Sequence, residues 1–171
     1  MLQPDDTAQD GGVSSGKSDN ILKNPYISFH VNDDGTIESG VIQVSYSDKV
    51  GQQVATDYFD RITNDYAAQG VILHFDIVGP SDHLLSGVLI WLNSCSASAD
   101  ACGSFSRGEA EVGGRVMYYS ASQAVTTPDH EFGHILGFAD SNSGIMSGAG
   151  NRQITFDFVQ RLRNCYIGNS C

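Results

Sequence analysis

Two histidines four residues apart, His130 and His134, flank a glutamate at position 131. This H-E-x-x-H spacing limits the folds and functions open to the chain more than any other feature. On a helix, residues at i and i+4 lie on one face, one turn apart, so both imidazoles can reach the same metal ion. Glu131 then lies beside that ion, where its carboxylate accepts a proton from a water molecule. The motif predicts a helix that carries a hydrolytic zinc site.

The helix expected around this motif has recognisable ends. Thr127 suits the N-cap and Pro128 the first helical position, because a proline farther inside would break the helix. Gly137 suits a left-handed turn at the C-terminal end. Asp140 then follows as a possible third metal ligand, and Met146 lies in a Gly-Ile-Met-Ser turn beyond it.

These residues together resemble the metzincin clan of zinc peptidases, whose pattern is H-E-x-x-H-x-x-G-x-x-H followed by a methionine turn. The chain departs from that pattern at the third ligand position, which holds Asp140 and not a histidine. An aspartate there resembles the snapalysin-like branch of small secreted bacterial proteases, and a carboxylate is a competent zinc ligand. The resemblance implies one zinc ion held by His130, His134 and Asp140, with Glu131 as catalytic base and Met146 beneath the site.

Other zinc sites are compatible with H-E-x-x-H alone. Thermolysin-like peptidases use a downstream glutamate as third ligand, and no glutamate follows Glu131 here, which excludes them. Asp157 is the other downstream carboxylate, but it lies near the start of a predicted helix, where the helix dipole explains it. Two alternatives to a peptidase stay open: a zinc-binding protein without catalysis, and a zinc hydrolase or toxin domain that acts on a non-peptide amide.

Composition narrows the class of protein. A chain of 171 residues with 40% hydrophobic residues is expected to form one globular domain, here assigned to residues 23–171 after a flexible arm at residues 1–22. The net charge of −11 argues against nucleic acid or an anionic membrane as partner. No apolar run reaches membrane-spanning length, and no signal peptide is visible. We expect a monomer that acts on a protein or peptide substrate.

Four cysteines form two close pairs in the sequence, Cys95 with Cys102 and Cys165 with Cys171. Three pairings are possible, and proximity favours these two disulfides. Four free thiols in a cytosolic protein are the alternative. Two disulfides would indicate an oxidising, extracytoplasmic compartment, in agreement with a secreted protein.

The expected fold is α+β and metzincin-like, with a twisted mixed sheet, a crossover helix, the site helix, and a short C-terminal subdomain with one helix. Hydrophobic patterns and turn residues predict strands at 26–31, 40–46, 71–78, 87–93 and 115–119, and helices at 50–66 and 156–164. A short edge strand is expected within 104–112, where an extended substrate would pair. His30, His74 and His83 lack partners at ligand spacing; His74, on a strand, is expected in the interior.

Overall fold

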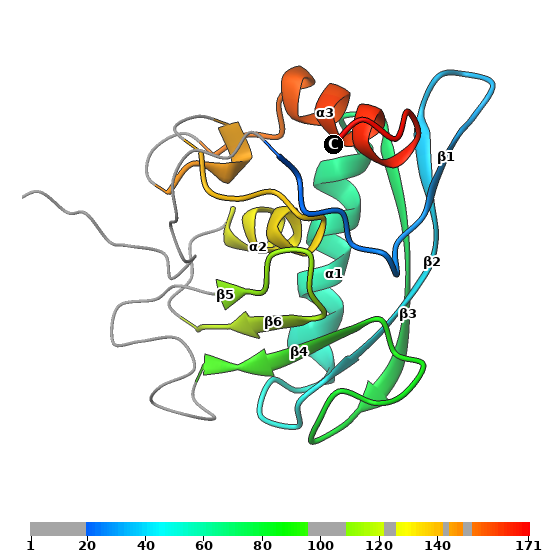
Figure 1. Cartoon of the computed structure of the whole chain (residues 1–171). Helices are drawn as coiled ribbons and strands as arrows, with labels where there is room; N and C mark the ends of the chain where they lie inside the picture. Colours follow the sequence, from blue (N-terminus) through cyan, green and yellow to red (C-terminus); the bar gives the residue numbers. More distant parts are fainter. Residues whose placement is uncertain (1–19, 96–108, 122–125, 142–143, 149–151) are drawn as a thin grey trace, which may run out of the picture.

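A mixed six-stranded sheet and three α-helices form the part of the chain that the computed structural model describes, residues 20–95, 109–121, 126–141, 144–148 and 152–171 (Figure 1). The α+β class and the mixed sheet are therefore confirmed. The strands are β1 (Phe29–Val31), β2 (Ile37–Tyr46), β3 (Val71–Pro80), β4 (Ile90–Ser94), β5 (Glu109–Ala110) and β6 (Val116–Tyr119). The helices are α1 (Gln52–Ala67), α2 (Thr127–Ile135) and α3 (Phe156–Tyr166).

The long strand β2 is the centre of the sheet. It pairs in parallel with β3 and β4 and antiparallel with β1, and the sheet then continues through β6 to the edge strand β5. Parallel pairing of β2 with β3 needs a crossover connection, which α1 supplies as the sequence predicts. The edge strand falls inside the range 104–112 expected for it, and it runs antiparallel to β6.

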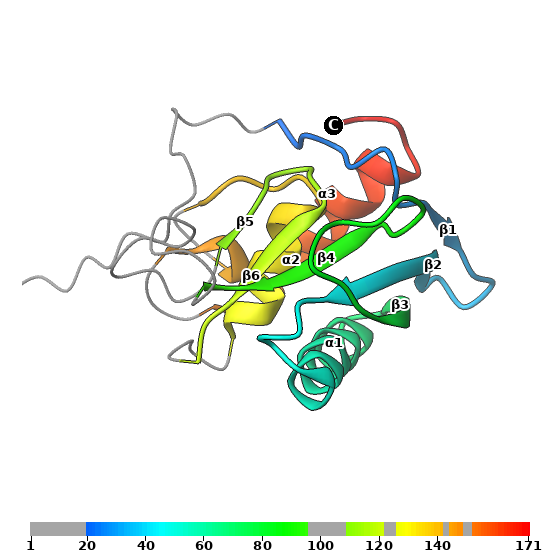
Figure 2. The ribbon, with the colours of Figure 1, turned by 90° about the horizontal axis from the view of Figure 1, so that it is seen from below.

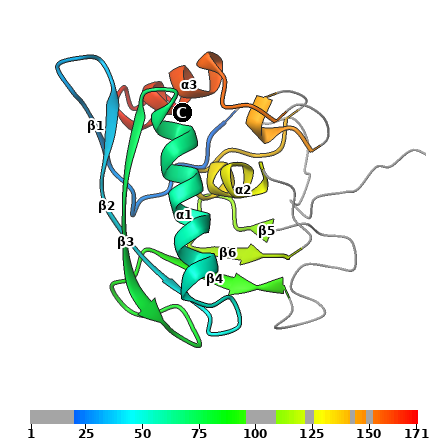
Figure 3. The same ribbon diagram turned by 180° about the vertical axis from the view of Figure 1, so that it is seen from behind.

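Helix α1 covers the sheet because its apolar residues recur at helical spacing. Ala55, Tyr58, Phe59, Ile62 and Tyr66 are all buried, which is the pattern of an amphipathic helix on a core. The helix packs against both β3 and α2, so the site helix lies beside it over the sheet (Figure 3). In Figure 2, α1 lies below the strands and α2 lies behind β4 and β6. Helix α2 therefore packs on α1 and on strands β5 and β6.

Strand β4 is shorter at its start than the sequence pattern predicts. It begins at Ile90 and not at residue 87. Gly87 has a φ of +84°, which turns the chain. The carbonyl groups of Val88 and Leu89 accept hydrogen bonds from the guanidinium of Arg115. The side chain of Arg115 thus donates to two carbonyl groups that would accept hydrogen bonds from a neighbouring strand if β4 were longer.

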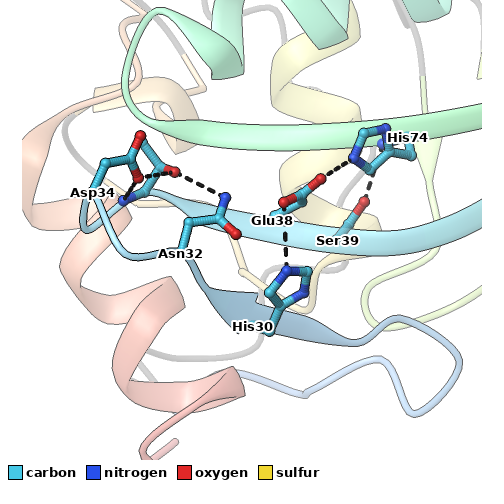
Figure 4. Close-up of polar contacts among 7 residues, drawn as sticks. His30, Asn32, Asp34, Glu38, Ser39 and His74 are labelled. Carbon is cyan, nitrogen blue, oxygen red and sulfur yellow. Dashed lines mark hydrogen bonds and ion pairs between the residues drawn. The ribbon is translucent and has the colours of Figure 1, made fainter.

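The expectation that His74 is an interior residue is wrong. Its side chain is 48% exposed on the outer face of β3, where Nε2 lies 2.5 Å from Oε1 of Glu38 (Figure 4). His30 of β1 contacts the other oxygen of Glu38 at 3.4 Å. Hydrogen bonds from His74 and Asn32 hold the pKa of Glu38 below its ordinary value. This surface cluster joins three strands on the outer face of the sheet.

One of the two predicted disulfides is present: Cys165 and Cys171 are bonded at the end of α3. Cys95 is also in a disulfide, and its predicted partner Cys102 lies outside the described residues, so that pairing stays a prediction. Residues 1–19 of the expected arm and residues 96–108 lie outside them as well. Within the described ranges, no helix is long and apolar enough to cross a membrane.

Candidate metal site

Helix α2 carries the site and is buried along its whole length. It begins one residue earlier than predicted, because Thr126 and not Thr127 is the N-cap, and Pro128 still lies in the first turn. Phe132 and Ile135 are completely buried and belong to the hydrophobic core. The polar residues of the helix are therefore buried too, where polar groups are stable only with partners.

Three ligand atoms converge beside α2. The Nε2 atoms of His130 and His134 are 3.1 Å apart, and Oδ1 of Asp140 lies 3.3 Å from each of them. In a tetrahedral zinc site with bonds of about 2.0–2.2 Å, neighbouring ligand atoms are separated by roughly 3.3–3.5 Å. This group of three residues is able to hold a metal ion. The distances between its three ligand atoms are close to those in a zinc site.

The outer nitrogens of both histidines are held by backbone carbonyl groups. Nδ1 of His130 donates to the oxygen of Ile145, and Nδ1 of His134 donates to the oxygen of Phe138, each over 2.7 Å. We assign the Nδ1–H tautomer to both rings on this ground, so both Nε2 atoms carry lone pairs. Two lone pairs that face each other over 3.1 Å are stable with a cation between them. This second layer of hydrogen bonds is typical of zinc-binding histidines.

Asp140 completes the triangle from the solvent side. Its side chain is 26% exposed, whereas those of His130 and His134 are 0% and 2% exposed. Burial raises the pKa of Asp140, but its contacts with His130 and His134 outweigh that effect and hold the pKa well below the usual range. Positive charge at the Nε2 positions, whether from protons or a metal ion, thus keeps the carboxylate ionised, which is the form that binds metal.

A Schellman turn after α2 brings Asp140 back to the histidines. Gly137 has a φ of +101°, its N–H donates to the oxygen of His134, and the N–H of Phe138 donates to the oxygen of Gly133. These are the two hydrogen bonds that define the motif. Only glycine adopts this conformation without strain. The reversal places Asp140 three residues after the glycine.

The methionine turn lies under the same helix. Gly144–Met146 forms one turn of 3-10 helix in which Met146 is 3% exposed. The N–H of Ser141 donates to the oxygen of Met146 over 2.8 Å, which joins this turn to the residue after Asp140. Because Ile145 also accepts from His130, the backbone of the turn contacts one candidate ligand directly and, at Ser141, the residue that follows another.

Two acidic residues of α2 are buried, and the sequence pattern does not reveal that Asp129 is one of them. Glu131 is 1% exposed, and Asp129 is 2% exposed. Burial, together with a hydrogen bond to Asp65, raises the pKa of Asp129 to about 8. Burial, together with the charges of Glu131 and Asp129, raises the pKa of Tyr58 well above its ordinary value. In sequence, Asp129 looks like a residue that favours the helix dipole, and only its burial against α1 distinguishes it.

Comparisons with known proteins identify no family for this chain. No protein-family model matches the sequence, and no curated protein matches it. Among solved structures, one similar chain is that of myroilysin, with 16% sequence identity and a TM-score of 0.38 over 77% of this chain. The match spans 63% of the length of that structure. A TM-score this low establishes neither a shared fold nor a shared activity, so the function depends on the site itself.

Proposed function

We propose that this chain is a zinc-dependent endopeptidase, with His130, His134 and Asp140 as ligands and Glu131 as catalytic base. The observation that carries the proposal is the triangle of two Nε2 atoms and one carboxylate oxygen with edges of 3.1–3.3 Å. A structural zinc site normally has four protein ligands, whereas a catalytic site has three and an open position. Among the described residues the group has three members, which favours the catalytic kind.

Each of the four proposed site residues has its own role in hydrolysis. When bound, zinc supplies a Lewis acid that polarises the substrate carbonyl and lowers the pKa of the attacking water. Glu131 takes the proton of that water and then delivers it to the leaving nitrogen. His130 and His134 keep their orientation because Ile145 and Phe138 accept their Nδ1 protons. As the third ligand, Asp140 would offset part of the ion's positive charge.

The edge strand β5 is the proposed substrate surface. It pairs with β6 on one side, and an extended peptide adds to the free edge of a sheet through main-chain hydrogen bonds. The Cys165–Cys171 disulfide is compatible with secretion or another extracytoplasmic location. A protein or peptide substrate, one zinc ion and a monomeric enzyme complete the proposal.

A digest of casein or of a peptide library, with and without chelator, tests this function. We expect cleavage that a chelator abolishes and that added zinc restores. Zinc-loaded protein that leaves every peptide intact would favour a binding protein. Release of small amines from non-peptide amides, with peptides left intact, would favour a zinc hydrolase that acts on non-peptide amides.

A further inference from the structure

The C-terminal end of α2 is closed by segments that are distant in sequence. A helix leaves its last four carbonyl groups without partners inside the helix. The Schellman turn uses the first two, of Gly133 and His134. The next two are taken from outside: the oxygen of Ile135 accepts from Nδ2 of Asn24 over 3.1 Å, and that of Leu136 accepts from the hydroxyl of Tyr166 over 2.8 Å.

The N-terminal segment 21–24, here called the strap, supplies part of this closure. The N–H of Leu22 donates to the oxygen of Gly137 over 2.9 Å. Asn24 is completely buried, and its Nδ2 also donates to the oxygen of Gly114 over 2.7 Å. Its N–H donates to the Tyr166 hydroxyl over 3.0 Å. Asn24 thus joins α2, the turn between β5 and β6, and α3 in one buried hydrogen-bond network.

Two glycines are required for the strap to lie where it does. A Cβ on Gly137 would be 2.1 Å from the oxygen of Leu22, and a Cβ on Gly113 would be 2.4 Å from the same atom. Both glycines have positive φ, +101° and +66°. The N–H of Gly113 donates to the oxygen of His134 over 2.7 Å. The backbone of Leu22 therefore fits tightly between the end of α2 and the β5–β6 turn.

We propose that the strap is a working part of the metal site and that Asn24 is a positioning residue for Asp140. This inference rests on the proposed zinc site. Only Phe138 and Ala139 separate the Gly137 turn from Asp140, and the oxygen of Phe138 orients His134. A shift of the turn therefore moves one ligand and releases another. In a well-formed zinc site the ligand distances agree with their expected values within about 0.2 Å, so we expect a shift of the turn to lower zinc affinity.

The test compares Asn24→Ala with Leu73→Ala in the full chain. Leu73 is a buried residue of β3, a strand that packs against α1, so its truncation destabilises the core without removing a hydrogen bond of Asn24. Zinc dissociation constants come from competition with a chromophoric chelator, at a temperature where circular dichroism shows every variant folded. We expect Asn24→Ala to bind zinc about 10-fold more weakly, the lower end of the effect of losing a hydrogen bond made to a ligand itself, because Asn24 acts through the turn. Leu73→Ala should keep the wild-type constant within about twofold.

A purely structural role of Asn24 makes a different prediction. In that case Asn24→Ala lowers the melting temperature of the zinc-free protein and leaves the zinc dissociation constant unchanged. That result would overturn the proposal. If Asn24→Ala does not fold, Tyr166→Phe takes its place, because it removes only the hydroxyl that links Asn24 to Leu136. The same loss of zinc affinity is expected, and wild-type affinity would again contradict the positioning role.

Hydrogen exchange separates a failure of the strap from a failure of the zinc site. In zinc-free protein, we expect Asn24→Ala to accelerate exchange at the amides of Phe138 and Ser141. The acceleration should be at least about tenfold greater there than at the core amides of β2, because a local opening exposes the turn without unfolding the core. Uniform acceleration would contradict the strap's role. Wild-type protein that binds no zinc, with the local acceleration intact, would refute the zinc site alone and leave the strap's hold on the turn supported.

Discussion

The sulfur of Met146 lies directly against the backbone of Gly133. A Cβ built on Gly133 would be 2.3 Å from Sδ and 3.2 Å from Cε of Met146. Gly133 is the second unspecified position of H-E-x-x-H, yet its neighbour leaves no room for a side chain. The methionine turn and the helix of the ligands are therefore packed as one unit.

Gly133→Ala should separate that unit. The new methyl group displaces Met146, and with it the Ile145 carbonyl that orients His130, at a cost of about 1–3 kcal/mol. Thermal melting and zinc titration measure the two effects. Gly148→Ala is the matched control, because nothing lies within 4 Å of a Cβ at that position. A Gly133→Ala protein as stable as this control would contradict the packing described here.

Gly137→Ala should cost more than its backbone angle alone explains. A non-glycine residue at positive φ costs roughly 1–2 kcal/mol. At Gly137 the methyl group also meets the oxygen of Leu22. Gly35→Ala isolates the backbone effect, since its φ is +86° and nothing lies within 4 Å of its Cβ. Denaturant unfolding of both variants gives the difference, and equal losses would show that the contact with Leu22 is unimportant.

Asp140→Ala tests the third ligand. Without the carboxylate, zinc affinity should fall by more than the roughly 10- to 100-fold typical of an outer-shell residue. Asp157→Ala is the control, because Asp157 is the other carboxylate downstream of the motif and lies in the first turn of α3. Competition titration of both variants decides the assignment. Unchanged affinity in Asp140→Ala would assign the third ligand elsewhere.

The Cys165–Cys171 disulfide should stabilise the end of α3. It closes a short loop of sequence separation 6, for which the chain-entropy contribution is about 2 kcal/mol. The double variant Cys165→Ser, Cys171→Ser should therefore melt roughly 4–8 °C lower than the wild type. Scanning calorimetry of both proteins without reductant measures the difference. A melting temperature that does not change would mean that the bond constrains nothing in the unfolded chain.

The sequence predicts the grouping of the three candidate ligands because the determinants of that grouping are local. His130, His134, the Gly137 turn and Asp140 lie within a dozen residues, so the geometry of one helix and the turn that ends it brings the three candidate ligands together. Closure of the helix end is not local. Asn24 donates to Ile135 across a separation of 111 residues, and beside Pro25 it looks like an ordinary turn residue. Only the packed structure shows that it is buried.

The prediction that His74 is an interior residue is wrong for a different reason. A strand of alternating burial has one face toward the core and one toward solvent, and the pattern must be assigned to the correct face. On β3, Val71 and Leu73 are buried, whereas His74 and Asp76 are exposed. Asp76 shares the face of His74, two residues away. That charged neighbour was the available signal that the histidine faces solvent.

The most direct test of the account is Glu131→Gln in zinc-loaded protein. The amide keeps the size of the side chain but accepts no proton, so peptide cleavage should fall by about 10²- to 10⁴-fold, the usual contribution of a general base. Zinc content, measured by atomic absorption, should stay at one ion per chain. Cleavage at the wild-type rate by a Glu131→Gln protein that holds its zinc would contradict the proposed mechanism.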